Sequence, residues 1–288
     1  MDRHKIITIL FLCMALLVGS VGTANDYHFV FNKTYSVRYS PPSKPRVMSV
    51  GLRLFDLKKY RDLMPIDSIY NEVLSYSEEL PFGDEHGRST NVHETVHGIN
   101  AAIRNKYKIM LKKNLNGFYA GSGKGILVEN PPLKIRDIIP FIPEVVRGYR
   151  YNLYFVKQLG DWNDTPTYPM DEWSAYIAGA ECAVDDALRD IRRKEKSDSV
   201  SGTLEFSIYC SALALAVKTK CIDYWNSNEQ FKNVIKYYLI KSEKTFFEGQ
   251  DLFPSPKQDL LLLHLREHKD TTELRNFLLL EFDGIFVD

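Results

Sequence analysis

Residues 89–107 read STNVHETVHGINAAIRNKY, and this stretch is predicted to form one long amphipathic helix. Valine and isoleucine occupy positions 92, 96, 99 and 103, which is the three- and four-residue spacing of a helical face that packs into a core. Ser89, Thr90 or Asn91 can cap the N-terminus of this helix. The opposite face is polar, so one side of the helix is free to carry chemistry.

The polar face holds an H-E-x-x-H motif made by His93, Glu94 and His97. Residues four apart lie on the same side of a helix, so the two imidazoles can bind one tetrahedral Zn²⁺. The glutamate between them can act as a general base toward water. The alternative is a surface helix that carries two histidines by chance. Gly98 favours the functional site, because glycine is a poor mid-helix residue that is tolerated best where another group approaches closely.

A catalytic zinc site needs a third protein ligand. The short third-ligand signatures are absent, since position 103 is isoleucine and no glutamate stands about 20 residues after the motif. The best candidate is Glu172, in a helix predicted over 171–194, where it is expected to lie in the first turn. The alternative ligands are Glu181, Asp171 and Glu144.

The helix that carries Glu172 has a flank of small residues. Alanine or glycine occupies positions 175, 178, 179, 180 and 183. Such a flank allows two helices to approach closely, because little side-chain volume separates their backbones. We therefore expect a short glutamate side chain on this helix to reach a metal ion held by the motif helix.

With these residues the chain resembles the zincin metallopeptidases of the gluzincin type, in which H-E-x-x-H supplies two histidines and a glutamate on a later helix completes the zinc site. The resemblance covers His93, Glu94 and His97 through the motif, and Glu172 through position and context. The long spacing before Glu172 departs from the thermolysin pattern. The resemblance implies a zincin-like fold, a Zn²⁺ cofactor and hydrolysis of peptide bonds in a peptide or protein substrate.

Hydrolysis of this kind needs a group that stabilises the oxyanion, and a tyrosine or histidine is expected to do so. Tyr176 is the first candidate because it stands one turn after Glu172; the alternatives are Tyr168, Tyr149 and Tyr119. The glycine-rich stretch 115–128 is predicted to be a β-hairpin. Zincins of this type bind peptide as an added strand, so the run Gly121–Gly125 is a candidate substrate-binding edge strand.

Residues 1–24 have the pattern of a secretory signal peptide. A short basic stretch precedes an apolar run from Ile6 to Val18, and Gly22 and Ala24 place small residues before a cleavage site. An uncleaved anchor is disfavoured, because a membrane span usually takes about 20 apolar residues. No later segment is expected to cross a membrane. We therefore expect a secreted or periplasmic protein without stable membrane insertion after cleavage.

The mature chain, residues 25–288, is long enough for one substantial core and is expected to be a single zincin-like domain. Its predicted parts are a β/α part at 25–80, a zinc-site core at 81–195 and a helical part at 196–288. With 37 basic and 37 acidic residues the formal net charge is +0, which gives no support for a nucleic-acid partner. Cys182, Cys210 and Cys221 remain after residue 24, and we expect them to be buried thiols; the alternative is one disulfide that involves Cys182.

The pattern of the whole chain predicts an α+β fold that is predominantly helical, with a small β-rich N-terminal part. Strands are expected at 27–39 and 47–54, and a helix capped by Asp67 is expected over 67–80. After residue 171 the chain is expected to be almost wholly helical, over 171–194, 204–225, 228–247, 257–268 and 271–281.

Two further motifs are interpreted as structural. The inverted motif H-x-x-E-H at 264–268 lies in a charged stretch and is interpreted as a solvated helix face. The run Gly121–Gly125 lacks the spacing of a phosphate loop and is interpreted as a hairpin turn. Two rival classes of protein stay open: an exported zincin-fold module that binds metal without catalysis, and an envelope structural protein without metal.

Overall fold

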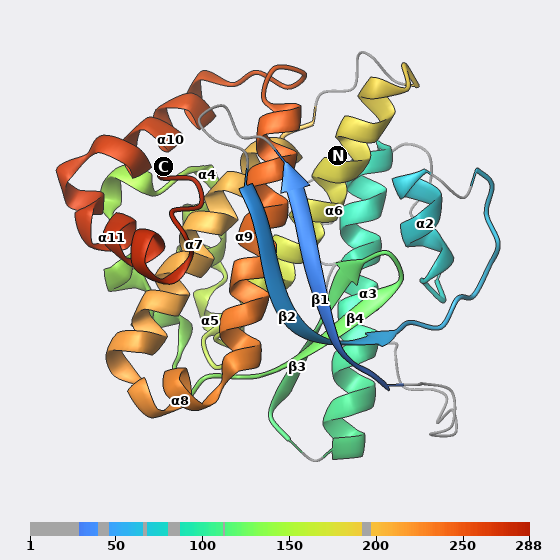
Figure 1. Cartoon of the computed structure of the whole chain (residues 1–288), viewed down its shortest axis with the longest axis horizontal. Helices are drawn as coiled ribbons and strands as arrows, with labels where there is room; N and C mark the ends of the chain where they lie inside the picture. Colours follow the sequence, from blue (N-terminus) through green and yellow to red (C-terminus); the bar gives the residue numbers. More distant parts are fainter. Residues whose placement is uncertain (1–28, 40–45, 66–67, 80–86, 112, 192–196) are drawn as a thin grey trace.

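Helices form most of the structure, and a four-stranded antiparallel sheet covers one side of them (Figure 1). The computed structural model describes residues 29–39, 46–65, 68–79, 87–111, 113–191 and 197–288, with side chains from residue 50 onward. The predicted signal peptide and Asp67, the predicted helix cap, lie outside the described residues. The prediction of a predominantly helical α+β fold is confirmed.

The sheet has the strand order β1-β2-β4-β3. Its strands are β1 (Phe29–Tyr39), β2 (Arg46–Asp56), β3 (Leu115–Gly121) and β4 (Lys124–Glu129), which confirms the predicted strands and the predicted hairpin. The β3–β4 turn contains Gly121, Ser122 and Gly123 at φ angles of 87°, 50° and 65°. Glycine occupies two of these left-handed positions because it has no Cβ to clash there, so the glycine-rich run is a turn.

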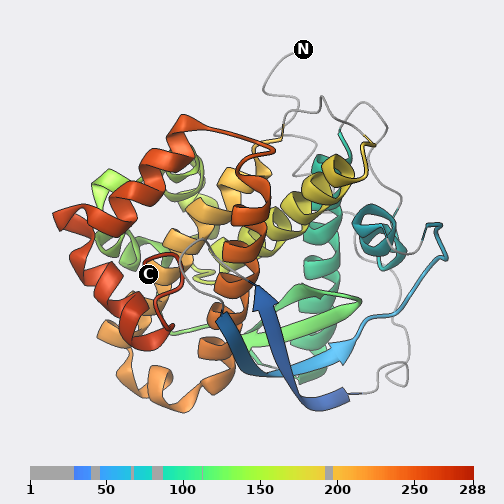
Figure 2. The ribbon, with the colours of Figure 1, turned by 45° about the horizontal axis from the view of Figure 1, so that its top comes forward.

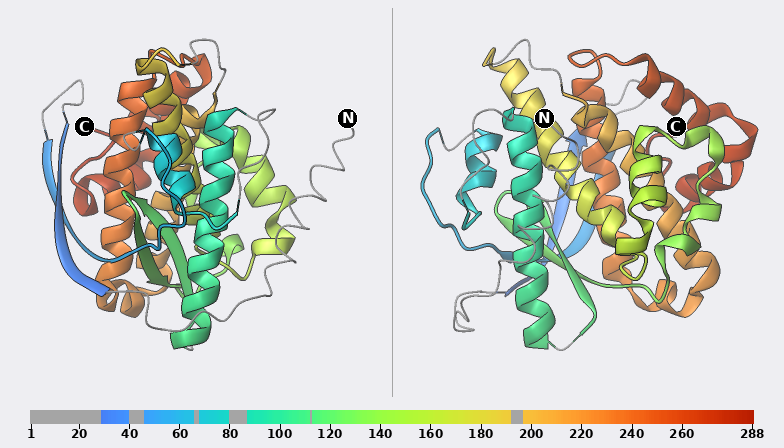
Figure 3. Two further views of the ribbon diagram at one scale, coloured as in Figure 1. Left: turned by 90° about the vertical axis from the view of Figure 1, so that its right-hand side faces the viewer. Right: turned by 180° about the vertical axis from the view of Figure 1, so that it is seen from behind.

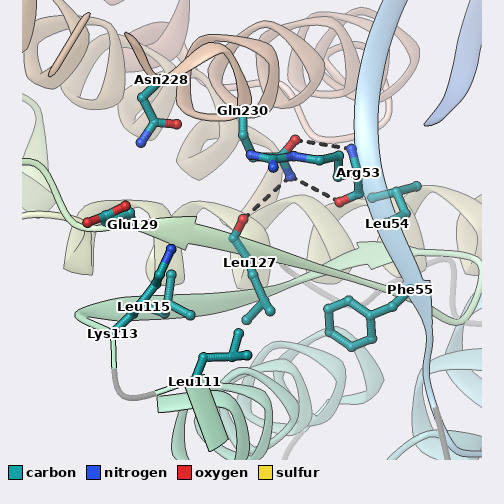
Figure 4. Close-up of a pocket in the computed structure, with 10 residues that line it drawn as sticks. All are labelled: Arg53, Leu54, Phe55, Leu111, Lys113, Leu115, Leu127, Glu129, Asn228 and Gln230. Atoms are coloured by element: carbon teal, nitrogen blue, oxygen red, sulfur yellow. Dashed lines mark hydrogen bonds between the residues drawn. The ribbon is translucent and has the colours of Figure 1, made fainter. Parts of the chain in front are cut away.

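The two halves of the sheet separate beyond a short junction. β2 pairs with β4 only from Leu54–Ile126 to Asp56–Lys124, and the side-chain amide of Gln230 bridges the strands where they part (Figure 4). This amide accepts from the backbone N–H of Arg53 and donates to the carbonyls of Arg53 and Leu127. A cavity of about 270 Å³ lies beside it, at the C-terminal end of the motif helix.

Four long helices form the centre of the helical part (Figures 1 and 3). They are α3 (Arg88–Leu111), α6 (Tyr168–Leu188), α7 (Ser199–Lys220) and α9 (Glu229–Gly249). Shorter helices flank them: α2 (Ile69–Ser75), α4 (Tyr149–Tyr151), α5 (Leu159–Trp162), α8 (Ile222–Ser227), α10 (Pro256–Glu267) and α11 (Thr272–Glu281). Between β4 and α5 the chain runs through three 3₁₀ turns and a π-helix at Asn152–Lys157.

Several predicted helix ends were wrong. α3 begins at Arg88, so Ser89, Thr90 and Asn91 lie inside the helix and do not cap it. α6 begins at Tyr168, before the predicted start at residue 171. Pro169 fits in the first turn, because a backbone N–H there would have no partner within the helix. Glu172 therefore lies in the second turn. The helix predicted over 67–80 is only Ile69–Ser75, and its N-cap residue is Ser68.

Helix α7 is long enough and apolar enough to span a membrane by length and composition, which the sequence analysis did not expect. It is almost entirely buried inside the protein, where it packs against α6 and α9 (Figure 2). This burial accounts for the apolar composition of α7, because a helix surrounded by other helices in a protein core is apolar on all sides. Cys182 and Cys210 are buried thiols as predicted, whereas Cys221, at the end of α7, is only partly buried.

The motif helix packs on α6 and on the β3–β4 hairpin. Its valines and isoleucines share a core with Ala175, Ala178 and Cys182 of α6, so part of the predicted flank of small residues lies at the contact between the two helices, whereas Ala180 packs in the other core cluster. Gly179 lies at a close approach, since a Cβ there would lie 3.1 Å from the carbonyl oxygen of Ser89. The predicted close contact between these helices is confirmed.

We predict that Gly117→Ala destabilises the protein. A Cβ at Gly117 of β3 would lie 2.2 Å from Cγ2 of Ile103, so the strand would have to move away from α3. Overpacking of this kind costs about 1–3 kcal/mol, which urea denaturation would measure as a lower free energy of unfolding. Gly160→Ala is the control, because nothing lies within 4 Å of a Cβ there. Equal stability of the two variants would contradict the prediction.

Candidate metal centre

Two helices bring the predicted metal ligands together. His93 and His97 lie on α3, and Glu172 lies on α6. These two helices pack side by side (Figure 3). One ligand atom of each residue lies within 4.8 Å of the other two. The structure therefore places Glu172, rather than an alternative acid, opposite the histidine pair.

The spacing of the three ligand atoms suits a small metal ion. Nε2 of His97 lies 3.1 Å from Nε2 of His93 and 3.4 Å from Oε2 of Glu172, and the third side of the triangle, from His93 Nε2 to Glu172 Oε2, is 3.7 Å. Bonds of about 2.0–2.1 Å in a tetrahedral site place neighbouring ligand atoms roughly 3.3 Å apart. The triangle fits this geometry and leaves a fourth position for another ligand.

Glu172 has one oxygen that the protein satisfies and one that it does not. Its Oε1 accepts a hydrogen bond of 2.7 Å from the hydroxyl of Tyr168. Its Oε2, the atom nearest the two imidazoles, is buried and accepts no hydrogen bond from the described residues. A buried carboxylate oxygen without a donor is costly, and a cation between it and the imidazoles would remove that cost. The site can therefore hold a metal ion.

Asp171 supports the site from behind His97. Its Oδ1 lies 2.5 Å from Nδ1 of His97, and its Oδ2 lies 3.5 Å from the guanidinium of Arg104. A carboxylate on the far nitrogen of a histidine fixes the ring so that the other nitrogen faces the metal. Asp171 was predicted as an alternative ligand, and the structure gives it this orienting position instead.

The charges of the triad are coupled. Burial, and then the positive charge of His97, lowers the pKa of His93 to about 3. Burial opposes protonation of His97 too, but the charge of Glu172 and the hydrogen bond to Asp171 outweigh it, so the pKa of His97 is raised well above 6.5. Burial raises the pKa of Glu172, yet His97 brings it down to about 2. These shifts favour a neutral His93 and an ion pair between His97 and Glu172.

The other two alternative ligands lie elsewhere. Glu181 pairs with Lys241 at 3.0 Å, and Glu144 is exposed beside Arg147. Neither belongs to the described group that could hold a metal ion.

Of the four tyrosines predicted as candidates, two lie at the triad and two lie away from it. The ring of Tyr176 packs edge-on against His93 at 4.5 Å between centroids, so it lies at the site. Tyr168 lies there as well and donates to Glu172. Tyr149 is 76 % exposed, and Tyr119 donates to Glu72. Only the first two are placed to act on a group bound at the triad.

Two further residues at the site, Arg150 and Tyr154, were not predicted from the sequence. Arg150 is 2 % exposed, bonds the carboxylate of Glu205 and stacks over the ring of Tyr176 at 4.5 Å. Tyr154, on the π-helix, hydrogen-bonds to Tyr176. Burial raises the pKa of Tyr176, while Arg150 lowers it. No spacing signal links these residues to the motif, because the contacts join segments far apart in the chain.

The backbone of Tyr119 on the edge strand β3 is already hydrogen-bonded inside the protein. The backbone N–H of Tyr119 donates to the side chain of Asn100, and its carbonyl accepts from the hydroxyl of Tyr238. Both outward-facing backbone groups of this residue are therefore occupied. At Tyr119, therefore, the edge of β3 is not free to pair with an added strand.

The histidines of the inverted motif have hydrogen-bond partners away from the triad. His264 of the inverted motif donates from Nδ1 to the carbonyl of Val145, and Nδ1 of His268 accepts from the backbone of Asp270. The cavity beside Gln230 is lined by Leu111, fourteen residues beyond His97 and so about 21 Å away along the helix. It is separate from the triad.

Comparisons with models of protein families, with curated proteins and with solved structures find no match to this chain. The geometry of the triad therefore carries the functional argument alone.

We predict that Asp171→Asn weakens metal binding by 10- to 100-fold, the usual effect of losing a carboxylate that orients a ligating histidine. Competition titration of the purified mature protein with a Zn²⁺ indicator would measure the affinity. Glu144→Gln is the control and should leave the affinity unchanged, because Glu144 is exposed and distant. Wild-type affinity in Asp171→Asn would show that His97 needs no such support.

A second prediction concerns protons. Because the pKa of His97 lies well above 6.5, this ring is protonated at pH 7, and binding of Zn²⁺ should release about one proton per site. Affinity should rise with pH up to the pKa of His97. Calorimetry in buffers of different ionisation enthalpy counts the protons. Release of none at pH 7 would contradict the charge states given above.

Proposed function

We propose that the chain is an exported zinc metallopeptidase that hydrolyses peptide bonds. The observation that carries the proposal is the buried triad of His93, His97 and Glu172, in which Oε2 of Glu172 faces two imidazole nitrogens without a hydrogen-bond donor. The H-E-x-x-H motif supplies the two histidines and places Glu94 between them.

The donor set favours zinc among the common metals. Two imidazole nitrogens and one carboxylate oxygen are ligands that Zn²⁺ takes in catalytic sites with one position left open. Calcium and magnesium prefer six or more oxygen ligands, which this site does not offer among the described residues. Three protein ligands at tetrahedral spacing agree with a catalytic rather than a closed structural site.

The residues around the triad suit hydrolysis. A zinc ion held here would supply Lewis acidity, which makes water nucleophilic near neutral pH and polarises a carbonyl group. Glu94 would accept the proton of the attacking water and return one to the leaving amine. Tyr176, held between His93 and Arg150, would donate a hydrogen bond to the developing oxyanion. Tyr168 would hold Glu172 so that Oε2 faces the metal.

The sequence supplies the setting for this activity. A signal peptide at residues 1–24 would direct the chain to a secreted or periplasmic location, so the substrate would be a peptide or protein outside the cytoplasm. The balanced charge gives no basis for a nucleic-acid partner.

One alternative is favoured by a specific observation. The side chain of His93 is only 12 % exposed, and the nearby strand edge is closed at Tyr119. A site with so little access also fits a zincin-fold module that binds metal and acts as an interaction partner in the cell envelope or extracellular space. Turnover of a peptide separates the two functions.

We predict that Glu94→Gln retains zinc but loses at least 10²- to 10⁴-fold of peptide hydrolysis, because the general base is removed while the ligands stay. The measurement combines metal analysis with mass-spectrometric detection of cleavage in a diverse peptide library. Glu267→Gln, the matched change in the H-x-x-E-H stretch, is the control and should alter neither.

Three results would count against this assignment. Wild-type protein without zinc would refute the metal centre. Equal cleavage by wild type and Glu94→Gln would assign the activity to another group or a contaminant. Tight zinc binding without cleavage by either protein would favour the binding module.

A further inference from the structure

Three consecutive apolar side chains are exposed at the C-terminal end of α3. Ile109 is 79 % exposed, Met110 is 40 % exposed and Leu111 is 41 % exposed. Single apolar residues are ordinary on a protein surface, whereas a contiguous exposed run of them usually marks an interaction surface. In Figures 1 and 3 this end of α3 extends past the strands of the sheet, so the apolar run 109–111 stands on a projecting end of the molecule.

The charge around the apolar run is positive, although the formal net charge of the whole chain is +0. No aspartate or glutamate occurs between Glu94 and Glu129, whereas six basic residues do: Arg104, Lys106, Lys108, Lys112, Lys113 and Lys124. Two of the six pair with aspartates of other elements. Lys108 and Lys113, which flank the apolar run, are exposed and form no ion pair with a described residue. The end of α3 therefore offers apolar contacts and unpaired positive charge together.

A cavity of about 270 Å³ adjoins the apolar run at Leu111 (Figure 4). Its apolar walls come from α3 and three strands and consist of Leu54, Phe55, Leu111, Leu115 and Leu127. The cations Arg53 and Lys113 line the same cavity, and Glu129 is the one acidic residue among the described residues that line it. Arg53, like Lys113, is exposed and has no ionic partner among the described residues. The cavity therefore continues the apolar and cationic surface from α3 onto the sheet.

An anionic lipid surface fits this combination better than a nucleic acid or an acidic protein does. Lysines beside exposed apolar side chains are typical of segments that lie in the headgroup region, where the lysines meet phosphates and the apolar groups meet acyl chains. A nucleic acid is contacted mostly through its phosphates, so it would use the lysines and leave the apolar run in water. A protein partner would need a groove shaped to receive the projecting helix end, whereas a fluid headgroup layer needs no such complementary surface.

We propose that the protein docks on an anionic membrane surface through the end of α3. The apolar run enters the headgroup region, and Lys108, Lys113 and Arg53 contact lipid phosphates. This is peripheral binding without a membrane span, so added salt reverses it. The inference does not rest on the proposed function, because Leu111 lies about 21 Å from His97 along the helix and the contact uses no residue of the triad.

Sedimentation with vesicles measures this binding. The mature protein, residues 25–288, is mixed with sucrose-loaded vesicles made of phosphatidylcholine and phosphatidylglycerol in equal parts, or of phosphatidylcholine alone. We expect binding to the anionic vesicles that falls as salt is added. Binding to phosphatidylcholine alone should be weaker by about tenfold or more, because a neutral surface does not attract the lysines.

Two pairs of substitutions test the two parts of the surface. Lys108→Gln with Lys113→Gln should weaken binding to the anionic vesicles by roughly 25-fold, because each lysine near such a surface contributes roughly fivefold. Ile109→Ser with Met110→Ser should weaken it by about tenfold or more, because less apolar surface then leaves water on docking. Thermal unfolding of each variant verifies that it is folded.

Matched pairs on α10 and α11, at the other side of the molecule, serve as controls (Figure 1). Lys257→Gln with Lys269→Gln changes the net charge by the same amount, and both lysines are exposed. Leu279→Ser with Leu280→Ser removes two exposed leucines that stand beside Glu281 instead of beside lysines. Both control pairs should bind the anionic vesicles as tightly as the unchanged protein.

Three outcomes would overturn the inference. Equal binding to the two kinds of vesicle would remove the role of lipid charge. Equal loss in the control pairs and in the pairs on α3 would place the contact elsewhere. Weakening by the lysine pair alone, together with tighter binding to duplex DNA than to vesicles, would assign the surface to a nucleic acid. None of these measurements depends on zinc or on cleavage, so failure here leaves the proposed function to its own test.

Discussion

The burial of the Glu172 carboxylate against two imidazoles is the constraint on which the rest of the structure depends. A buried, ionised carboxylate is unfavourable unless a cation or several donors surround it. Here α3 and α6 must approach closely enough for the short side chain of Glu172 to reach His97, and this distance requires small residues at the contact. Gly179 and the alanines of α6 at this contact therefore help to bring Glu172 to the two histidines. The same contact buries the apolar face of α3, so the core and the triad stabilise each other.

A second layer of residues fixes the charges of the triad. Asp171 hydrogen-bonds to Nδ1 of His97, and the hydroxyl of Tyr168 donates to Oε1 of Glu172. Arg150, which lies over the ring of Tyr176, forms an ion pair with Glu205. Among the oxygen atoms of the triad, Oε2 of Glu172 is the one that accepts no hydrogen bond from the described residues. Such an arrangement would direct a cation to this oxygen and the two imidazoles, because the neighbouring groups hold the ligands in place.

Much of this architecture could be predicted from the sequence, and the failures have physical causes. The periodicity of α3, the alternation in the strands and the glycine-rich turn are local signals, and each led to the correct element. Glu172 was found because a motif demanded a third ligand and a helix with small residues offered one. The helix ends were predicted less accurately. Serine often caps a helix, so Ser89 was a reasonable cap by residue type, but in the structure its hydroxyl donates to the carbonyl of Gly179. Arg150 and Tyr154 were missed because their contacts depend on how the 148–168 segment folds over α6, which no local pattern encodes. The closed edge of β3 was missed for the same reason, as Asn100 and Tyr238 come from two different helices.

The ion pair between His97 and Glu172 bears on how metal binding relates to folding. Small zinc domains are unfolded without metal because their ligands have no other reason to meet. In this chain an apolar core packs α3 on α6, so the two helices have a reason to bring the ligands together that does not depend on a metal ion. A metal ion bound at the triad would replace the proton that the neighbouring carboxylates favour on His97, and it would change the chemistry of the site more than the fold. Such an arrangement would suit the proposed catalysis, which needs its ligands in place before the substrate arrives.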